Sequence, residues 1–88
     1  MISTPQHNQQ VAAIFRSIAE RLAAQRANPY RIRAYRKAAD TIEALEEDIA
    51  DVASRQALED IDGIGRDLAD KIEEFLRTGT IQAYEALR

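Results

Sequence analysis

Two glycines flank a single apolar residue in the segment Gly63-Ile64-Gly65, and a stretch with helical periodicity follows it. A glycine can adopt positive φ and leaves its amide uncovered by a side chain. Two glycines at the start of a helix therefore form a concave set of N–H groups, to which the helix N-terminus adds partial positive charge. Such an arrangement binds phosphate. We predict that Gly63, Ile64, Gly65 and Arg66 hold one phosphate group.

The charged residues are separated along the chain, although the net charge of −3 does not by itself indicate a nucleic-acid partner. The segment from Arg26 to Lys37 contains five basic residues and no acid. The segment from Asp40 to Asp62 contains nine acids and one base, Arg55. This separation gives a polyanion one attractive face and one repellent face. Since charged faces are often merely solvated, the pattern supports DNA binding only together with the glycine pair.

The elements that must position these residues are predicted to be helices, because apolar residues recur at helical spacing and no alternating strand pattern occurs. The first helix is predicted to begin at a capping Asn8 and to end near Arg26 or Ala27. The dipeptide Asn28-Pro29 interrupts it, since a residue before proline avoids the α region. The second helix is predicted from about Tyr30 to Ala44.

An acidic connector with room for one helical turn follows, and then the two arms of a hairpin. The first arm is a short helix from about Ser54, its cap, to Asp60. The second arm runs from about Arg66 to Arg77, and Gly79 is predicted to end it in a left-handed conformation. Residues 80–87 are a candidate for a short extra helix.

These elements predict an all-α fold, a compact four-helix domain at residues 8–88 with a flexible polar tail at residues 1–7. Without cysteine, the chain has neither a disulfide framework nor a thiolate metal site. No apolar run reaches the length of a membrane span, and no signal peptide is visible, so we expect a cytoplasmic, nucleoid-associated monomer. The predicted core contains Phe15, Ile18, Leu22, Ile42, Ile61, Leu68, Ile72 and Phe75.

The pattern apolar-x-Gly-Ile-Gly-x-x-x-Ala-x-Lys-Ile resembles the helix-hairpin-helix motif of DNA-binding proteins, here at about residues 54–77. In that family the hairpin amides bind the DNA backbone, often with a monovalent cation. The resemblance thus implies Na⁺ or K⁺ at the backbone of Ile61 and Gly63, and no other cofactor is expected. The alternative interpretation is that Gly-x-Gly is only a tight turn between two helices.

A wider resemblance covers about residues 8–88. Residues 27–39, the hairpin, and residues 75–79 occur in the order and spacing of the small amino-terminal domain of family X DNA polymerases. The bacterial and archaeal enzymes are the more similar, and DNA polymerase beta is more distant. The resemblance implies a DNA-repair role, binding gapped or nicked DNA at its 5′-phosphate. No polymerase active site is present, so we expect either a domain normally fused to a polymerase or a free-standing relative.

Some of these relatives are also deoxyribose-phosphate lyases, used in base excision repair, in which a lysine forms a Schiff base with the sugar. Lys71 occupies that position. Asp67, Ala83 and Glu59 replace basic residues of the relatives, and Asp67 and Asp70 favour the charged ammonium. Two outcomes therefore stay open: catalysis through Lys71, or binding alone.

The remaining site residues follow from the same resemblance. Arg31 matches a phosphate-pocket lysine, and Arg33 and Arg36 lie close by on the same predicted helix. Tyr30 matches a ring that stacks on a template base, and Tyr35 matches a tyrosine that lines the phosphate pocket. Tyr35 also fits the apolar stripe of its helix, and Tyr30 also fits a structural role beside Pro29. A different class of function, a helical protein-interaction module that uses the acidic connector, is the alternative to DNA binding.

Overall fold

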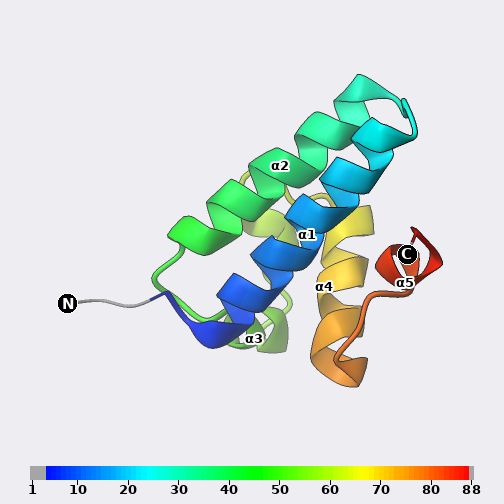
Figure 1. Ribbon diagram of the computed structural model, residues 1–88. Coiled ribbons are helices and arrows are strands. Elements are labelled where there is room, and N and C mark those ends of the chain that lie inside the picture. Colours follow the sequence, from blue (N-terminus) through cyan, green and yellow to red (C-terminus); the bar gives the residue numbers. More distant parts are fainter. Residues whose placement is uncertain (1–3, 88) are drawn as a thin grey trace.

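Two long antiparallel helices form the base of the fold in the computed structural model, which describes residues 4–87 (Figure 1). They are α1 (Gln6–Ala24) and α2 (Pro29–Ala44). The chain reverses between them through Arg26, whose φ is 57°, and the Ala27 N–H donates to the Leu22 carbonyl at 2.9 Å. Asn28 then caps α2, because its Oδ1 accepts from the Tyr30 N–H at 2.8 Å. The predicted break at Asn28-Pro29 is confirmed.

Asn8 does not cap α1, contrary to the prediction, because the helix begins two residues earlier and Asn8 is fully buried within it. A buried amide must find hydrogen-bond partners. The Asn8 Nδ2 donates to the Glu47 carbonyl at 2.9 Å, and its Oδ1 accepts from the Ile49 N–H at 2.9 Å. Asn8 therefore ties α1 to the start of the third helix. Residues 1–3 of the predicted tail lie outside the described residues.

The third helix, α3 (Ile49–Ser54), lies earlier in the chain than predicted. Asp48 caps it by accepting from the Ala50 N–H at 2.8 Å, and Ile49 and Val52 are buried beneath it. Gln56, with φ of 58°, then ends the helix. The prediction of a helix from Ser54 to Asp60 was wrong: Ser54 is the last residue of α3, and only the 3-10 turn η1 (Leu58–Asp60) follows. The cap at Asp48 prevailed because the helix that it starts buries two aliphatic side chains.

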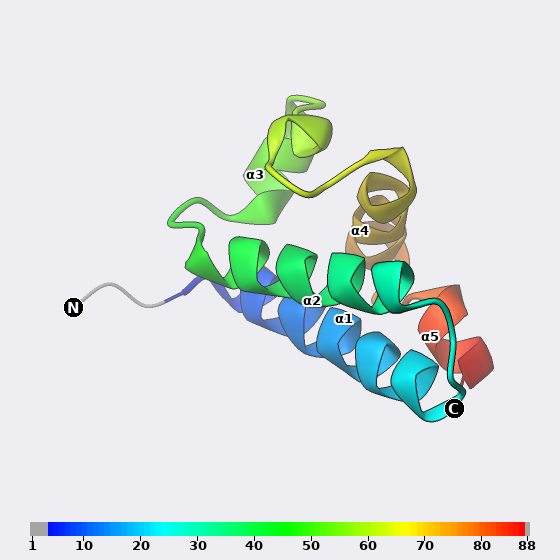
Figure 2. The same ribbon diagram turned by 90° about the horizontal axis from the view of Figure 1, so that it is seen from above.

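The second hairpin arm and the terminal helix agree with the prediction. Helix α4 (Arg66–Thr78) ends at Gly79, whose φ is 84° and whose N–H donates to the Phe75 carbonyl at 2.7 Å. Helix α5 (Gln82–Leu87) follows and packs against α1. Seen from above, α3, the hairpin and α4 form a second layer beside the pair of long helices (Figure 2). Helix α1 contacts α3 and α4, and the Lys37 stem of α2 lies against Gly63, so both long helices meet the hairpin region.

The described part of the chain contains helices and no strand, so the all-α prediction is confirmed. Of the eight predicted core residues, all but Ile61 are buried. Ile61 is only half-buried, and Ile64 enters the core in its place at 3 % exposure. Among the described helices, none is long and apolar enough to cross a lipid bilayer.

Candidate nucleic-acid interface

The hairpin is a tight turn anchored in the core. The Ile64 N–H donates to the Ile61 carbonyl at 3.0 Å, and the Ile64 side chain is buried. Gly63 has φ of 84°, which disfavours any residue with a Cβ. The Ile64 N–H is already used in a hydrogen bond within the turn, so it is not available to a ligand. Of the four predicted phosphate-binding residues, Ile64 therefore contributes a structural anchor.

The start of α4 leaves backbone donors uncovered. Gly65 is the N-cap and provides no side-chain acceptor, and the Ala69 N–H makes the first bond of the helix, to the Gly65 carbonyl at 2.9 Å. Within residues 4–87, the N–H groups of Gly65, Arg66 and Asp67 have no hydrogen-bond acceptor. A Cβ placed on Gly65 would meet no atom within 4 Å, so the space beside this end of the helix is open. The arrangement suits an anion, because the donors and the helix dipole act in the same direction.

Lys37 brings a positive charge from α2 to the hairpin, which the sequence analysis missed. Its methylene chain covers Gly63, with Cε 3.5 Å from the position that a Cβ on this glycine would take. Its Nζ lies 3.5 Å from the Asp62 Oδ2, and both side chains are largely exposed. An exposed pair at this distance is weak and leaves the ammonium available to a stronger anion.

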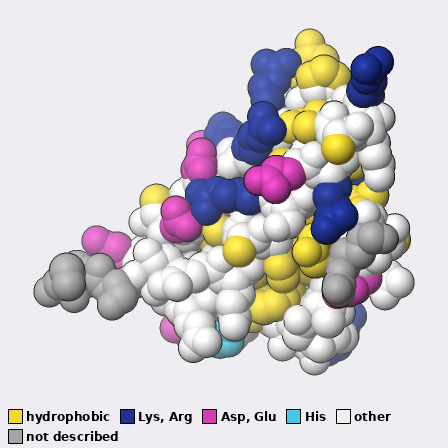
Figure 3. All heavy atoms as spheres, in the orientation of Figure 1, with side chains coloured by type: hydrophobic (Ala, Val, Ile, Leu, Met, Phe, Trp, Pro, Cys, Tyr) yellow, Lys and Arg dark blue, Asp and Glu magenta, His cyan; other side chains and the backbone are white. Residues whose placement is uncertain are grey.

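The three predicted arginines do not converge on one phosphate. Successive positions on an α-helix are separated by about 100°, so residues three or four apart share a face. Arg33 shares a face with Arg36 and Lys37, whereas Arg31 shares the face of Tyr35. Arg36 lies beside α1, where it lines a hollow with Arg16, Glu20 and Asp40. Figure 3 shows Lys and Arg side chains gathered over the upper part of α1 and α2, with Asp and Glu among them.

The two predicted stacking residues differ in their surroundings. Tyr30 is 75 % exposed, and the Arg33 guanidinium lies 5.0 Å from the centroid of its ring. Tyr35 is buried, and its ring packs edge-on against Phe15 with the centroids 5.4 Å apart. Tyr30 is thus free to stack on a base, whereas the Tyr35 ring belongs to the core.

Lys71 is held as a cation. Its Nζ donates to the Asp67 Oδ1 at 2.8 Å, and its side chain is only 18 % exposed. Burial alone would lower the pKa of Lys71, but the Asp67 carboxylate and the neighbouring Tyr35 hydroxyl together outweigh it and raise this pKa. The contact with Asp67 thus favours the charged ammonium, as the sequence predicted. A charged amine cannot attack an aldehyde, so this geometry favours ion pairing over Schiff-base formation.

The comparison with known proteins agrees with this geometry. A family model described as "Helix-hairpin-helix domain" matches residues 6–81, so the chain belongs to this family. Helix-hairpin-helix domains commonly bind DNA, and membership supports a DNA partner in general terms. No curated protein matches the chain.

Proposed function

We propose that this domain binds the sugar-phosphate backbone of DNA without base specificity. The observation that carries the proposal is the open start of α4 beside the ammonium of Lys37. One phosphate would accept from the N–H groups of Gly65, Arg66 and Asp67 while Lys37 supplies positive charge. The Lys37 stem lies against Gly63, two residues before Gly65, and in this proposal its ammonium and the α4 donors would contact the same phosphate.

We further propose that the preferred DNA is gapped and carries a 5′-phosphate. Arg31 lies one helical turn from Tyr35, which neighbours Lys71, so a guanidinium and an ammonium lie on the same side of α2. These two cations would hold the terminal phosphate. The exposed Tyr30 ring, backed by Arg33, would stack on the base that a gap uncovers. In this proposal Lys71 binds phosphate rather than acting as the nucleophile of a lyase.

The hairpin also fits a monovalent cation as a second ligand of the phosphate. Backbone carbonyls are suitable ligands for K⁺ or Na⁺. The Gly63 carbonyl accepts no hydrogen bond within the described residues, and the Ile61 carbonyl accepts one and keeps a second lone pair. These two oxygens would hold the ion, and DNA affinity would then differ between Na⁺, K⁺ and a bulky organic cation at equal ionic strength.

Fluorescence anisotropy tests the proposal with three labelled duplexes: intact, gapped, and gapped with a 5′-phosphate. We expect the phosphorylated gap to bind most tightly and two unrelated sequences to bind equally. Lys37→Ala should weaken binding several-fold and reduce the salt slope by about one, as expected for one lost phosphate contact.

Arg77→Ala is the matched control, since this exposed arginine lies at the opposite end of α4. It removes the same charge but should leave the salt slope unchanged. Equal effects of the two substitutions would show that only net charge matters and would contradict the proposed contact at the hairpin.

A further inference from the structure

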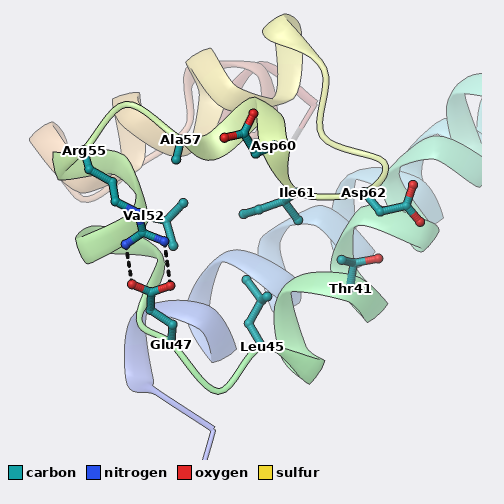
Figure 4. A pocket seen from close by; sticks show the side chains of 9 residues that line it. All are labelled: Thr41, Leu45, Glu47, Val52, Arg55, Ala57, Asp60, Ile61 and Asp62. Carbon is teal, nitrogen blue, oxygen red and sulfur yellow. Dashed lines mark hydrogen bonds and ion pairs between the residues drawn. The ribbon is translucent and has the colours of Figure 1, made fainter.

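A groove lies between the C-terminal end of α2, α3 and the first half of the hairpin, apart from the open start of α4 (Figure 4). Its volume is about 490 Å³. Leu45, Val52 and Ile61 turn toward the same space and form an apolar floor. Leu45 and Ile61 remain half-buried, so the floor presents apolar surface that the fold itself does not cover. Ile61 was predicted to be a core residue, and its position in this groove is the reason for its exposure.

The rim of the groove is acidic. Of its three carboxylates, Glu47 is neutralised by the Arg55 guanidinium, whose Nη2 lies 2.8 Å from the Glu47 Oε1. Asp62 has only the distant Lys37 ammonium at 3.5 Å. The Asp60 carboxylate has neither a hydrogen bond nor an ion pair in the described part of the chain. With three carboxylates and the single guanidinium of Arg55, the lining of the groove carries net negative charge next to an apolar floor.

This combination excludes DNA as the ligand and selects a basic one. A polyanion is repelled by the rim, which belongs to the acidic segment that begins at Asp40. An uncharged apolar ligand would make no use of the negative charge of Asp60 and Asp62. A ligand with apolar side chains on one face and Lys or Arg beside them would fill the floor and pair with the rim at the same time.

We propose that this groove binds a basic amphipathic helix of a partner protein. Apolar side chains one turn apart would enter between Leu45, Val52 and Ile61, in the manner of a helix in a groove. Basic side chains flanking them would pair with Asp60 and Asp62. The domain would then carry two separate binding surfaces: the start of α4 for DNA and this groove for a protein.

The test uses a fluorescein-labelled Leu/Lys peptide of about 15 residues, the length at which isolated helices begin to be stable in water. Its leucines are spaced to form one helical face. Two control peptides replace either the leucines by serine or the lysines by glutamate. The wild-type domain should bind the amphipathic basic peptide and neither control, because the groove requires both apolar contact and positive charge.

The double substitution Asp60→Asn/Asp62→Asn should weaken this binding about three- to tenfold, the range for two exposed ion pairs. The matched control is Asp70→Asn/Glu73→Gln, which removes two exposed carboxylates of α4 that lie outside the groove. It should leave the affinity unchanged. Equal weakening by both double variants would overturn the proposal, since binding would then depend on net charge alone.

Leu45→Asn tests the apolar floor, with a thermal melt as the check that the domain stays folded. Should it unfold, Ala57→Arg serves instead, because this half-buried alanine faces the groove and a longer side chain would fill it. Either folded variant should lose peptide binding and keep DNA binding. The proposal would be overturned if the wild type did not bind the peptide. It would also be overturned if a folded Leu45→Asn or Ala57→Arg domain lost DNA binding.

Analytical sedimentation of the domain alone tests the alternative that a second copy of this chain occupies the groove. Tyr30 is the large hydrophobic side chain that lies exposed in the described residues, and arginines flank it. Self-association that disappears in both Leu45→Asn and Tyr30→Ser would show that another copy fills the groove, which would refute a separate partner.

Discussion

Replacement of Gly65 by aspartate should separate the stability of the fold from DNA binding. Gly65 has φ of −87° and ψ of −173°, an extended conformation that any residue adopts, and space around its Cβ is open. An aspartate here would be an N-cap whose carboxylate accepts from the uncovered amides of α4. The same carboxylate would occupy the position that we propose for the DNA phosphate. The substitution should therefore preserve the fold and abolish the site.

The magnitudes follow from these contacts. An N-cap aspartate is better than glycine by a few tenths of a kcal/mol, and its charge at a helix N-terminus adds about 0.3–1 kcal/mol. Repulsion from the neighbouring Asp62 and Asp67 opposes this gain, so we expect unfolding free energy equal to or slightly above that of the wild type. On the binding side, loss of hydrogen bonds to a charged group costs about 1.5–3 kcal/mol, or roughly ten- to a hundredfold in affinity.

Thermal unfolding and anisotropy titration on the gapped, 5′-phosphorylated duplex measure the two quantities. Gln10→Glu is the matched control, because it adds the same charge at an exposed position near the start of α1, outside the hairpin. It should keep wild-type affinity to within a small factor. Wild-type affinity of a folded Gly65→Asp domain would refute the phosphate site, and an equal loss in the control would reduce the effect to net charge.

Three further outcomes are expected. Asp62→Asn should tighten DNA binding a few-fold, measured by anisotropy at two salt concentrations, because it releases Lys37 and removes a repelling charge. Asp67→Asn should lower the pKa of Lys71, because burial then acts without the opposing carboxylate. Borohydride trapping on a 5′-deoxyribose-phosphate substrate should then increase at a given pH. Trapping that persists after Lys71→Ala would contradict the assignment of Lys71 as the imine-forming residue. Asp48→Ala should cost about 1 kcal/mol of unfolding free energy at neutral pH through the lost cap. Burial alone would raise the pKa of Asp48, but the hydrogen bond from the α3 amide and the adjacent imidazole outweigh burial and lower this pKa. The stability difference between wild type and Asp48→Ala should therefore be complete above the ordinary carboxylate pKa. It should vanish as the pH falls through the lowered pKa of Asp48 in the folded protein.

The sequence predicted the fold wherever local signals agreed with one another. Helix α4 combines regular apolar spacing with a glycine at each end, and both of its boundaries were predicted closely. Before the hairpin the predicted cap was Ser54, whereas the structure uses Asp48, six residues earlier, and both residue types can cap a helix. Only the tertiary packing of Ile49 and Val52 decides between them. The prediction that Asn8 caps α1 was wrong for a related reason. Its hydrogen-bond partners, Glu47 and Ile49, lie far along the chain and give no local signal.

The candidate site was predictable as a set of residue types and less so as a geometry. The glycine pair and the Asp67–Lys71 spacing are local features, and four residues on a helix bring two side chains together. Lys37 gave no such signal, because nothing local shows that the hairpin comes to lie against its face of α2. The three arginines were grouped by nearness in sequence, whereas the helix separates Arg31 from the face that Arg33 and Arg36 share.

The uncovered amides of α4 also make it possible to detect a ligand at the proposed phosphate site by hydrogen exchange, without attaching a probe to the protein. Exchange of an amide proton for deuterium requires a break in its hydrogen bond, so exchange is slow in a helix interior and at Ile64, whose N–H is bonded within the turn. Gly65, Arg66 and Asp67 are ordered yet unbonded in the described structure, and their protons should exchange as quickly as those of an unfolded chain. A phosphate that accepts from these groups would slow their exchange selectively, while an anion bound elsewhere would not. Exchange at these three adjacent amides thus reports how much of the time a ligand occupies the start of α4.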